Sequence, residues 1–557
     1  MSPDLSTEDE KLMRVLIAKA RLATRLIPAL SLLLASTPWV MGQTAGSTAI
    51  PGSTAKVDQT SETKKLITVK EPVAMQVYQR NDENFADIPI VLDKEGASET
   101  LGSVHLSGRK LSSEVVYRDG KLLKVPTGGP YVLTLNFNNA KEEGRSYGRS
   151  SGRSLMIEPI YVGDLWVLAG QSNMEGVGNL IDVTPPSDRV FALGMDGKWV
   201  KAEEPLHWLV DSPDPVHSGD PADRASRSEA QHATRTKGAG LGLPFASYLA
   251  SKTGVPIGLV PTAHGGTSMA QWDPAKKGEG GNSLYGSMLR QIKLAGGKVR
   301  GILWYQGESD AMGEAAKVYP KVFTDFIAAV RNDLGQPELP FYFVQIGRFI
   351  VGADLNKGWN AVQDAQRQLV DKVLNTAVVA SVDLELDDLI HVGTSGQKRL
   401  GKRLALIALR ELFNDVGATT PTFDSIRKRA DHTLVLKFKG VNHGPVPSVN
   451  GAQSTRTMVN GSSAAPFGFN NSGFQGLQPS KHIAGFSIRK EDGTELPLIF
   501  DASVGKSRDT VELKLVGDVP AGASLWYGYG LNPYGNLTDA LDMAVPVFGP
   551  IPLDHIE

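Results

Sequence analysis

Five short apolar runs in the middle of the chain predict buried strands. They are Leu165–Ala169, Ile257–Thr262, Gly301–Tyr305, Phe341–Ile346 and Ala377–Val382. Because these runs do not alternate with polar residues, they are typical of strands that are covered on both faces, as in a parallel sheet.

The stretch between the third and fourth runs has the spacing of a helix. Apolar residues recur there at intervals of three and four, and Gly335-Gln336-Pro337 ends the pattern. The positions concerned are Val318, Val322, Phe323, Phe326, Ile327 and Val330. Strands that alternate with helices predict a three-layer α/β/α domain with a mostly parallel sheet, which we place at residues 161–415.

The regions on either side of this domain show a different pattern. Short alternating segments separated by Gly, Asn and Asp fill residues 65–160 and 416–557. We predict a β-sandwich-like domain at each end, and neither contains an evident catalytic set. Trp526, Tyr527, Tyr529 and Tyr534 could stack on sugars in the second of these, although aromatic residues in strands more often belong to a core.

The first residues have the order of a secretory signal. Basic residues up to Arg25 precede the apolar run Leu26–Ala35, and small residues follow near Gly42. We expect residues 1–42 to be a signal peptide, with Met13 as an alternative start, and residues 43–64 to be a flexible linker. The predicted location is secreted, periplasmic or on the cell surface, without stable membrane insertion, because the apolar run is short for a span.

Composition narrows the classes of function. The 557 residues carry a formal net charge of −2 and contain no cysteine. This charge gives no electrostatic reason to expect nucleic acid as a partner. The absence of cysteine excludes both disulfides and a cysteine nucleophile, and the length favours several domains over one core.

A serine directly follows the first predicted strand. It is Ser172, in the run Gly170-Gln-Ser-Asn-Met174, while Asp388 and His391 follow the last predicted strand. A serine hydroxyl is activated when a histidine accepts its proton and a carboxylate orients that histidine. Since ligands bind beyond the carboxyl ends of strands in open α/β sheets, we expect the three side chains to meet there.

Two further polar segments follow the second and third predicted strands. They are His264-Gly-Gly-Thr-Ser268 and Gln306-Gly-Glu-Ser-Asp310. Each candidate also has a structural explanation: a serine after a strand often caps a helix, paired glycines allow a tight turn, and a buried glutamine often bonds to backbone. A D-x-x-H pair alone is weak evidence, so the hypothesis depends on all four segments together.

The segments GQSNM, HGGTS, WYQGESDA and DLIHVGTSGQKRLGKRLA together resemble the sialate O-acetylesterase-like (SASA) domain of the SGNH hydrolase superfamily, which includes carbohydrate esterase family 6. AEEPLH and GLGLPFA are closest to plant-type members. The resemblance covers residues of about 160–413 and implies a flavodoxin-like α/β/α fold.

The resemblance also implies roles for individual residues. Ser172 would be the nucleophile, His391 the general base and Asp388 the residue that orients it. The oxyanion hole would use the backbone N–H groups of Ser172 and Gly265 and the side-chain amide of Gln306, which replaces the asparagine that superfamily members often have. As substrate-binding residues we name Gln171, His264, Thr267, Trp272 and Glu308.

Residues 203–232 hold a second cluster of His and Asp residues. Their spacing matches no metal-ligand pattern, so we predict an insertion near the mouth of the pocket, and we expect neither a metal nor a cofactor.

The leading hypothesis is a secreted carbohydrate O-acetylesterase that acts on an acetylated glycan. The alternatives are a general serine esterase and an inactive glycan-binding protein. GQSNM lacks the second glycine of G-x-S-x-G, which argues against an α/β-hydrolase. The sequence leaves the glycan and the oligomeric state open.

Overall fold

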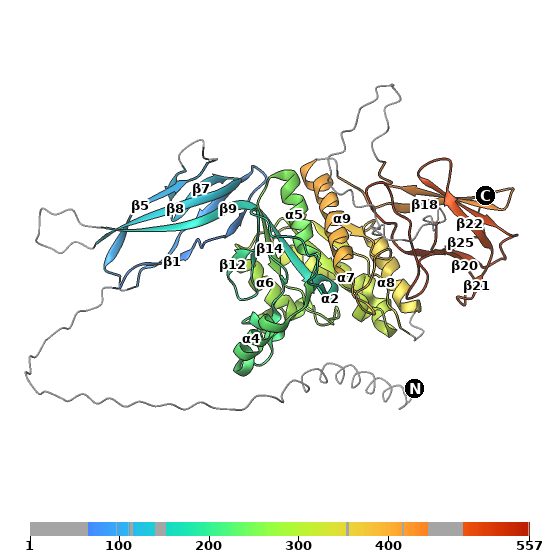
Figure 1. The fold of residues 1–557 in the computed structure, drawn as a ribbon, viewed down its shortest axis with the longest axis horizontal. Coiled ribbons are helices and arrows are strands. Elements are labelled where there is room, and N and C mark those ends of the chain that lie inside the picture. The colour runs from blue at the N-terminus through green and yellow to red at the C-terminus, as the bar shows by residue number, and fades with distance from the viewer. Residues whose placement is uncertain are drawn as a thin grey trace, which may run out of the picture. The chain divides into compact units, whose positions relative to one another are not determined.

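The computed structural model describes residues 65–95, 97–109, 111, 115–139, 152–351, 356–414, 417–443, 483–554 and 556. The predicted signal peptide and linker lie outside these residues. The elements are arranged as Figure 1 shows.

A mostly parallel sheet forms the centre of the described chain. All five predicted runs are strands of this sheet, which confirms the prediction of a parallel α/β core. Its order is β12 (Trp199–Lys201), β11 (Val190–Leu193), β14 (Ile257–Pro261), β9 (Arg153–Gly170), β15 (Gly301–Tyr305), β16 (Phe341–Val344) and β17 (Thr376–Val379). Only β12 on this path is antiparallel to its neighbour.

Helices cover both faces of the sheet. Trp166 is paired with Gly301, three positions before Trp304, so the two tryptophans point to opposite faces. Trp166 packs against Phe245 and Trp304 packs against Phe326. The helices of this domain include α5 (Gly242–Thr253), α6 (Leu284–Leu294), α7 (Gly313–Asp333), α8 (Asn356–Leu369) and α9 (Thr394–Phe413). Since α5 pairs with α9 and α7 with α8, these contacts define three layers.

Helix α7 is the helix that the spacing predicts. Its buried side includes Phe323, Phe326, Ile327 and Val330, as expected, whereas the predicted position Val318 is 55% exposed. The chain leaves the helix at Gly335, whose φ of 58° is in the left-handed region that glycine tolerates.

Strand β9 passes through two parts of the molecule. Its first half pairs with β8 (Gly128–Asn139) and β2 (Val77–Gln79), and its second half pairs with β14 and β15. The predicted boundary at residue 160 therefore falls inside one continuous strand. The other strands of this region are β1 (Thr68–Glu71), β3 (Phe85–Pro89), β4 (Val91–Asp93), β5 (Glu99–Ser107), β6 (Tyr117–Arg118) and β7 (Lys121–Pro126).

The C-terminal region contains two four-stranded sheets. Leu436 of one sheet and Ile488, Leu525 and Tyr527 of the other belong to the same hydrophobic core. One sheet has the order β18 (Thr422–Arg429), β19 (Thr433–Lys439), β23 (Thr510–Leu515) and β22 (Ile499–Val504), and the other β21 (Glu495–Leu496), β20 (Phe486–Arg489), β24 (Ser524–Tyr527) and β25 (Phe548–Pro552).

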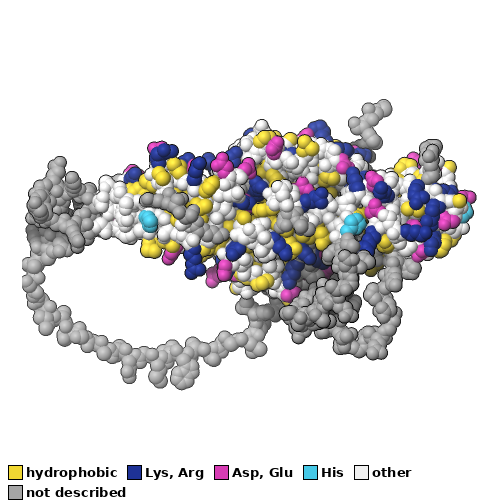
Figure 2. All heavy atoms as spheres, turned by 90° about the horizontal axis from the view of Figure 1, so that it is seen from above, with side chains coloured by type: hydrophobic (Ala, Val, Ile, Leu, Met, Phe, Trp, Pro, Cys, Tyr) yellow, Lys and Arg dark blue, Asp and Glu magenta, His cyan; other side chains and the backbone are white. Residues whose placement is uncertain are grey.

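The surface carries basic and acidic side chains side by side, without a large area of one sign in the view of Figure 2. Within the described residues, no helix combines the length and the apolar character needed to span a membrane.

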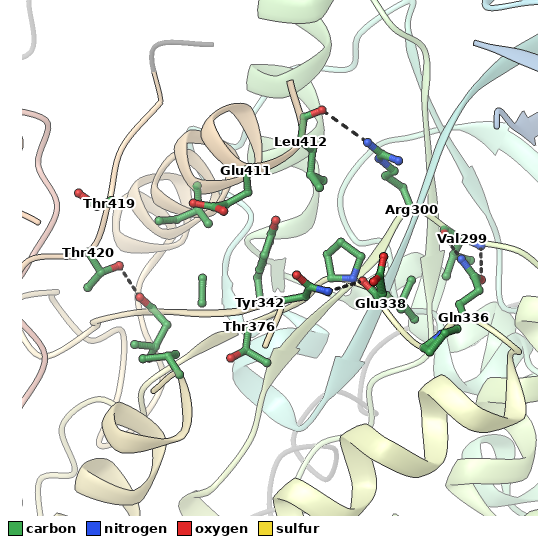
Figure 3. A pocket seen from close by; sticks show the side chains of 18 of the residues that line it. Val299, Arg300, Gln336, Glu338, Tyr342, Thr376, Glu411, Leu412, Thr419 and Thr420 are labelled. Atoms are coloured by element: carbon green, nitrogen blue, oxygen red, sulfur yellow. Dashed lines mark hydrogen bonds between the residues drawn. The ribbon is translucent and has the colours of Figure 1, made fainter. Parts of the chain in front are cut away.

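A hollow of about 1060 Å³ lies at the amino ends of β15, β16 and β17 (Figure 3). It is lined by Arg300, Tyr342 and Thr376 near the starts of these strands and by Glu411 and Thr420. This edge of the sheet is opposite to the one that holds Ser172, so the hollow is separate from the predicted catalytic residues.

Gly163 lies in the middle of β9, where the strand passes from one region to the next. A Cβ atom at this position would lie 1.9 Å from the carbonyl oxygen of Pro256. We expect Gly163→Ala to lower the free energy of unfolding by about 2 kcal/mol or more, because the clash is with backbone. Chemical denaturation measures this. Gly278→Ala, which adds its methyl group to open space, is the control, and an equal loss in both variants would contradict the interpretation.

Candidate active site

Ser172 lies at a sharp turn after β9. The strand ends at Gly170, whose φ is 133°, and α2 (Ser172–Glu175) begins two residues later. A Cβ atom on Gly170 would lie 2.3 Å from the carbonyl oxygen of Tyr305. Only glycine allows β9 and β15 to approach this closely, and the turn leaves Ser172 at the carboxyl edge of the sheet.

The structure brings Ser172, His391 and Asp388 together. Ser172 Oγ lies 2.9 Å from His391 Nε2. On the other side of the ring, His391 Nδ1 lies 2.8 Å from Asp388 Oδ2. His391 and Asp388 lie in the loop before α9. The three side chains form one hydrogen-bonded series.

The Asp388 carboxylate is held in its ionised form. Partial burial raises its pKa. Hydrogen bonds from the N–H groups of Ile390 and His391 and from the His391 ring lower the pKa by more, so that it lies well below the usual range. Lys237 Nζ lies 3.3 Å from Oδ2. An ionised Asp388 accepts the proton on Nδ1 of His391, which leaves Nε2 free to accept the serine proton.

Asn173, beside the serine, joins three loops. Its Oδ1 accepts the N–H of Val392 at 3.0 Å, and its Nδ2 donates to Glu308 Oε1 at 2.9 Å. Gln397 of α9 donates to the Asn173 carbonyl at 3.1 Å. Sequence reasoning gave Asn173 no role, since only its position within GQSNM pointed to it.

Glu308 and Asp310 are buried carboxyl groups behind the serine. Burial raises the pKa of Glu308 to about 7, while the bond from Asn173 lowers it and the nearby Asp310 raises it. Burial also raises the pKa of Asp310, which accepts the N–H of Met269 at 2.9 Å. Both groups fix the surrounding loops.

Most of the predicted substrate-binding residues are closed to solvent. Gln171, Thr267, Trp272 and Glu308 are at most 4% exposed, and only His264 is half-buried. The Trp272 indole N–H donates to Thr267 Oγ1 at 2.9 Å, and its rings pack against Trp304. These four side chains therefore belong to the support of the site instead of its substrate-facing wall.

The three predicted oxyanion donors differ in availability. The buried amide of Gln306 donates to the carbonyl of Thr267 at 3.2 Å and to Asp310 Oδ2 at 2.5 Å, so both of its protons are in use. The N–H of Gly265 donates to Glu175 Oε2 at 2.8 Å. The N–H of Ser172 donates to no acceptor among the described residues. Of the three predicted oxyanion donors, only the N–H of Ser172 is therefore free. The bonds of the Gln306 amide give no support to its predicted role in the oxyanion hole.

The carboxylate of Glu175 accepts the hydrogen bond from the N–H of Gly265. Burial raises the pKa of its carboxyl group, against the effect of Arg235, whose Nη2 lies 3.7 Å from Oε1. Gly265 lies directly beside the serine, since a Cβ atom on it would be 3.4 Å from Ser172 Cβ.

His264 is stacked on a second histidine that the sequence did not connect with it. Its Nδ1 lies 3.0 Å from Nδ1 of His217, and the ring centroids are 5.2 Å apart. Burial lowers the pKa of both rings, that of His217 to about 3, so both are neutral at pH 7. One ring therefore donates to the other.

His217 belongs to the segment predicted as an insertion near the mouth of the pocket. The segment forms α3 (Pro215–Ser218) and α4 (Arg224–Thr234), with β10 (Gly178–Asn179) and β13 (Lys237–Ala239) paired nearby. Within the described part of the chain, no group of three or more His, Asp or Glu side chains is arranged to hold a metal ion.

The described chain therefore has a mostly parallel α/β sheet with a hydrogen-bonded series of Ser, His and Asp at its carboxyl edge. Residues 162–410 match the SASA family, described as carbohydrate esterase, sialic acid-specific acetylesterase. The chain thus contains a region similar to this carbohydrate esterase family, and it is a carboxylic ester hydrolase.

Two known proteins are similar to this chain. A probable carbohydrate esterase of Arabidopsis thaliana is 29% identical over 286 residues, which are 47% of this chain and 96% of the plant protein. The crystal structure of a carbohydrate acetylesterase from Xanthomonas citri has a TM-score of 0.54 at 22% identity and covers 87% of this chain and 99% of its own. The second comparison shows a shared fold.

The buried carboxyl group of Glu308 gives the stability a pH dependence. An acid whose pKa is raised on folding contributes stability at low pH, and this is lost as the pH rises through about 7. From pH 5 to pH 8 we expect the wild type to lose roughly 3 kcal/mol relative to Glu308→Gln. Denaturation at both pH values measures this. Glu314→Gln, which alters an exposed carboxylate, is the control, and parallel pH curves for wild type and Glu308→Gln would disprove the assignment.

Proposed function

We propose that the chain is a carbohydrate O-acetylesterase that works through an acyl-enzyme on Ser172. The observation that carries the proposal is the hydrogen-bonded series from Ser172 through His391 to Asp388. It lies at the carboxyl edge of the sheet, inside the domain that matches a carbohydrate esterase family.

In the first half of the reaction, Ser172 Oγ attacks the carbonyl carbon of the acetyl ester while its proton passes to His391 Nε2. Asp388 stabilises the resulting imidazolium through Nδ1. When the tetrahedral intermediate collapses, the bond to the sugar oxygen breaks and His391 returns the proton to that oxygen. Ser172 then carries the acetyl group.

In the second half, His391 takes a proton from water, and the hydroxide oxygen attacks the acetyl carbon. The bond to Ser172 Oγ breaks, acetate leaves, and the proton returns to Ser172. Each atom of the triad thus ends in its starting state.

The negative oxygen of each intermediate needs hydrogen-bond donors. The N–H of Ser172 is free for this role in the present arrangement. The N–H of Gly265 becomes a second donor when the Glu175 carboxylate turns away from it. One such donor is worth about 3 kcal/mol of transition-state stabilisation, so the position of Glu175 bears directly on the rate.

The acetylated sugar is proposed as the substrate because the family and both similar proteins are described as carbohydrate esterases or acetylesterases. The buried Trp272, Thr267 and Glu308 leave specificity to half-buried groups such as His264 and to the loops around the site.

We also propose that the chain is exported after removal of its first residues. The basic positions before Arg25 and the apolar run Leu26–Ala35 support this. We expect the first residue of the exported protein, determined by N-terminal sequencing, to come after Ala35. A mature chain that still begins before Ala35 would overturn the proposal.

Replacement of the nucleophile tests the proposed activity. We expect Ser172→Ala to lower acetate release from acetylated xylan, O-acetyl sialosides and an aryl acetate by at least about 10³-fold. Acetate is measured directly, and a fluorophosphonate probe is expected to label the parent but not the variant.

Ser251→Ala, which changes an exposed serine on α5, is expected to retain full activity and labelling. Undiminished acetate release by Ser172→Ala would exclude the proposed nucleophile. Preference for long acyl esters over acetylated sugars would indicate a general esterase, and no release from any substrate would favour an inactive glycan-binding protein.

A further inference from the structure

A groove runs between the esterase domain and the C-terminal region. Its two walls are joined by buried hydrogen bonds. Asn360 of α8, which is 2% exposed, donates to the carbonyl of Gly528 at 3.2 Å and accepts the N–H of Gly530 at 2.8 Å. Gln345 exchanges two hydrogen bonds with the backbone of Val547. The groove is therefore a fixed feature of this part of the fold.

The groove has a volume of about 1010 Å³. Side chains of α7 and α8 line one wall, and strands β24 and β25 line the other, with Trp526 and Tyr529 among its residues. This volume is large enough to hold a chain of several sugar units.

Trp526 forms a flat aromatic surface in this groove. A Cβ atom on Gly549 of the neighbouring strand would lie 2.6 Å from two atoms of the indole ring, so the ring lies flat over that glycine. The φ of 135° at Gly549 also requires glycine. One face of Trp526 is thus covered by backbone, and the half-buried ring contributes its remaining surface to the groove.

Tyr529 lies beside this surface, with its ring nearly perpendicular to that of Trp526. Its ring lies 5.0 Å from that of Trp526 at an angle of 76°, and the guanidinium of Arg489 is 3.8 Å from its centroid. Of the four aromatic residues considered from the sequence, Tyr527 is fully buried in the core and Tyr534 is 70% exposed and is not part of the groove lining.

The opposite wall presents a row of polar groups. Asp364 and Gln368 lie four residues apart on α8, and Lys372 lies in the turn that follows the helix. Gln368 donates to Asp364 at 2.5 Å, and Lys372 donates to Gln368 at 3.1 Å. These three side chains offer hydrogen-bond donors and acceptors to the groove.

We propose that this groove binds a neutral oligosaccharide segment of the glycan on which the esterase acts, so the inference rests on the proposed function. Sugars present C–H faces that pack on aromatic rings and hydroxyls that pair with polar side chains. The charges that line the groove are close to balance, with Lys321, Lys372 and Lys490 against Asp325, Asp364, Glu491 and Asp554. This balance favours a neutral chain over a polyanionic one.

The test uses the full chain with Ser172→Ala as the parent, so that bound glycan is not altered. Binding to deacetylated neutral polysaccharides (xylan, glucomannan and xyloglucan) and to polygalacturonate is measured by affinity electrophoresis. We expect the parent to bind at least one neutral polymer and Trp526→Ala to bind it about tenfold more weakly. Ala361→Trp, which fills the groove from an exposed position on α8, is expected to cause a similar loss.

Tyr534→Ala is the matched control and is expected to bind like the parent. In variants that retain Ser172, hydrolysis of an aryl acetate is expected to be unchanged by Trp526→Ala and Ala361→Trp, while kcat/KM on acetylated polymer falls. Equal binding by Trp526→Ala and the parent, an equal loss in Tyr534→Ala, or binding of polygalacturonate alone would overturn the proposal. Loss of aryl acetate hydrolysis in the enzyme with Ser172 intact would instead count against the proposed function.

Discussion

The hydrogen bonds of the Asn173 side chain hold the site together. Ser172, Glu308 and His391 come from three different connections at the carboxyl edge of the sheet. A single carboxamide bonds to Glu308 on one side and to the backbone N–H of Val392, next to His391, on the other. Because a buried amide must find partners for both of its ends, this residue fixes the distance between the serine turn and the histidine loop.

The surroundings of the serine are unusually polar for a buried region. Glu308 and Asp310 lie behind it, and the neutral histidines 217 and 264 lie to one side. Burial of such groups is costly unless they are hydrogen-bonded. Glu308 is bonded to Asn173, and Asp310 is bonded to Met269 and Gln306, so these carboxyl groups hold the surrounding loops rigid. This rigidity would serve the proposed Ser172, His391 and Asp388 series, since catalytic atoms must be held in place before the substrate arrives.

The sequence predicted those features that depend on local pattern. The five apolar runs became neighbouring strands, and the buried side of α7 followed its spacing. The proximity of Ser172, His391 and Asp388 could be predicted because residues after parallel strands meet at one edge. The directions of single polar groups could not, since they depend on distant partners: Glu175 determines where the N–H of Gly265 points, and Asp310 determines where the amide of Gln306 points.

Strand β9 prevents the N-terminal region from being separated from the esterase sheet. Its 18 residues begin among the N-terminal strands and end at the turn that holds Ser172. Removal of the N-terminal region would cut the strand or strip its first half of hydrogen-bond partners, leaving an open edge. The N-terminal region is therefore a structural extension of the esterase sheet and not an attachment on a linker. A chimeric protein would have to take the N-terminal region and the esterase sheet from the same parent.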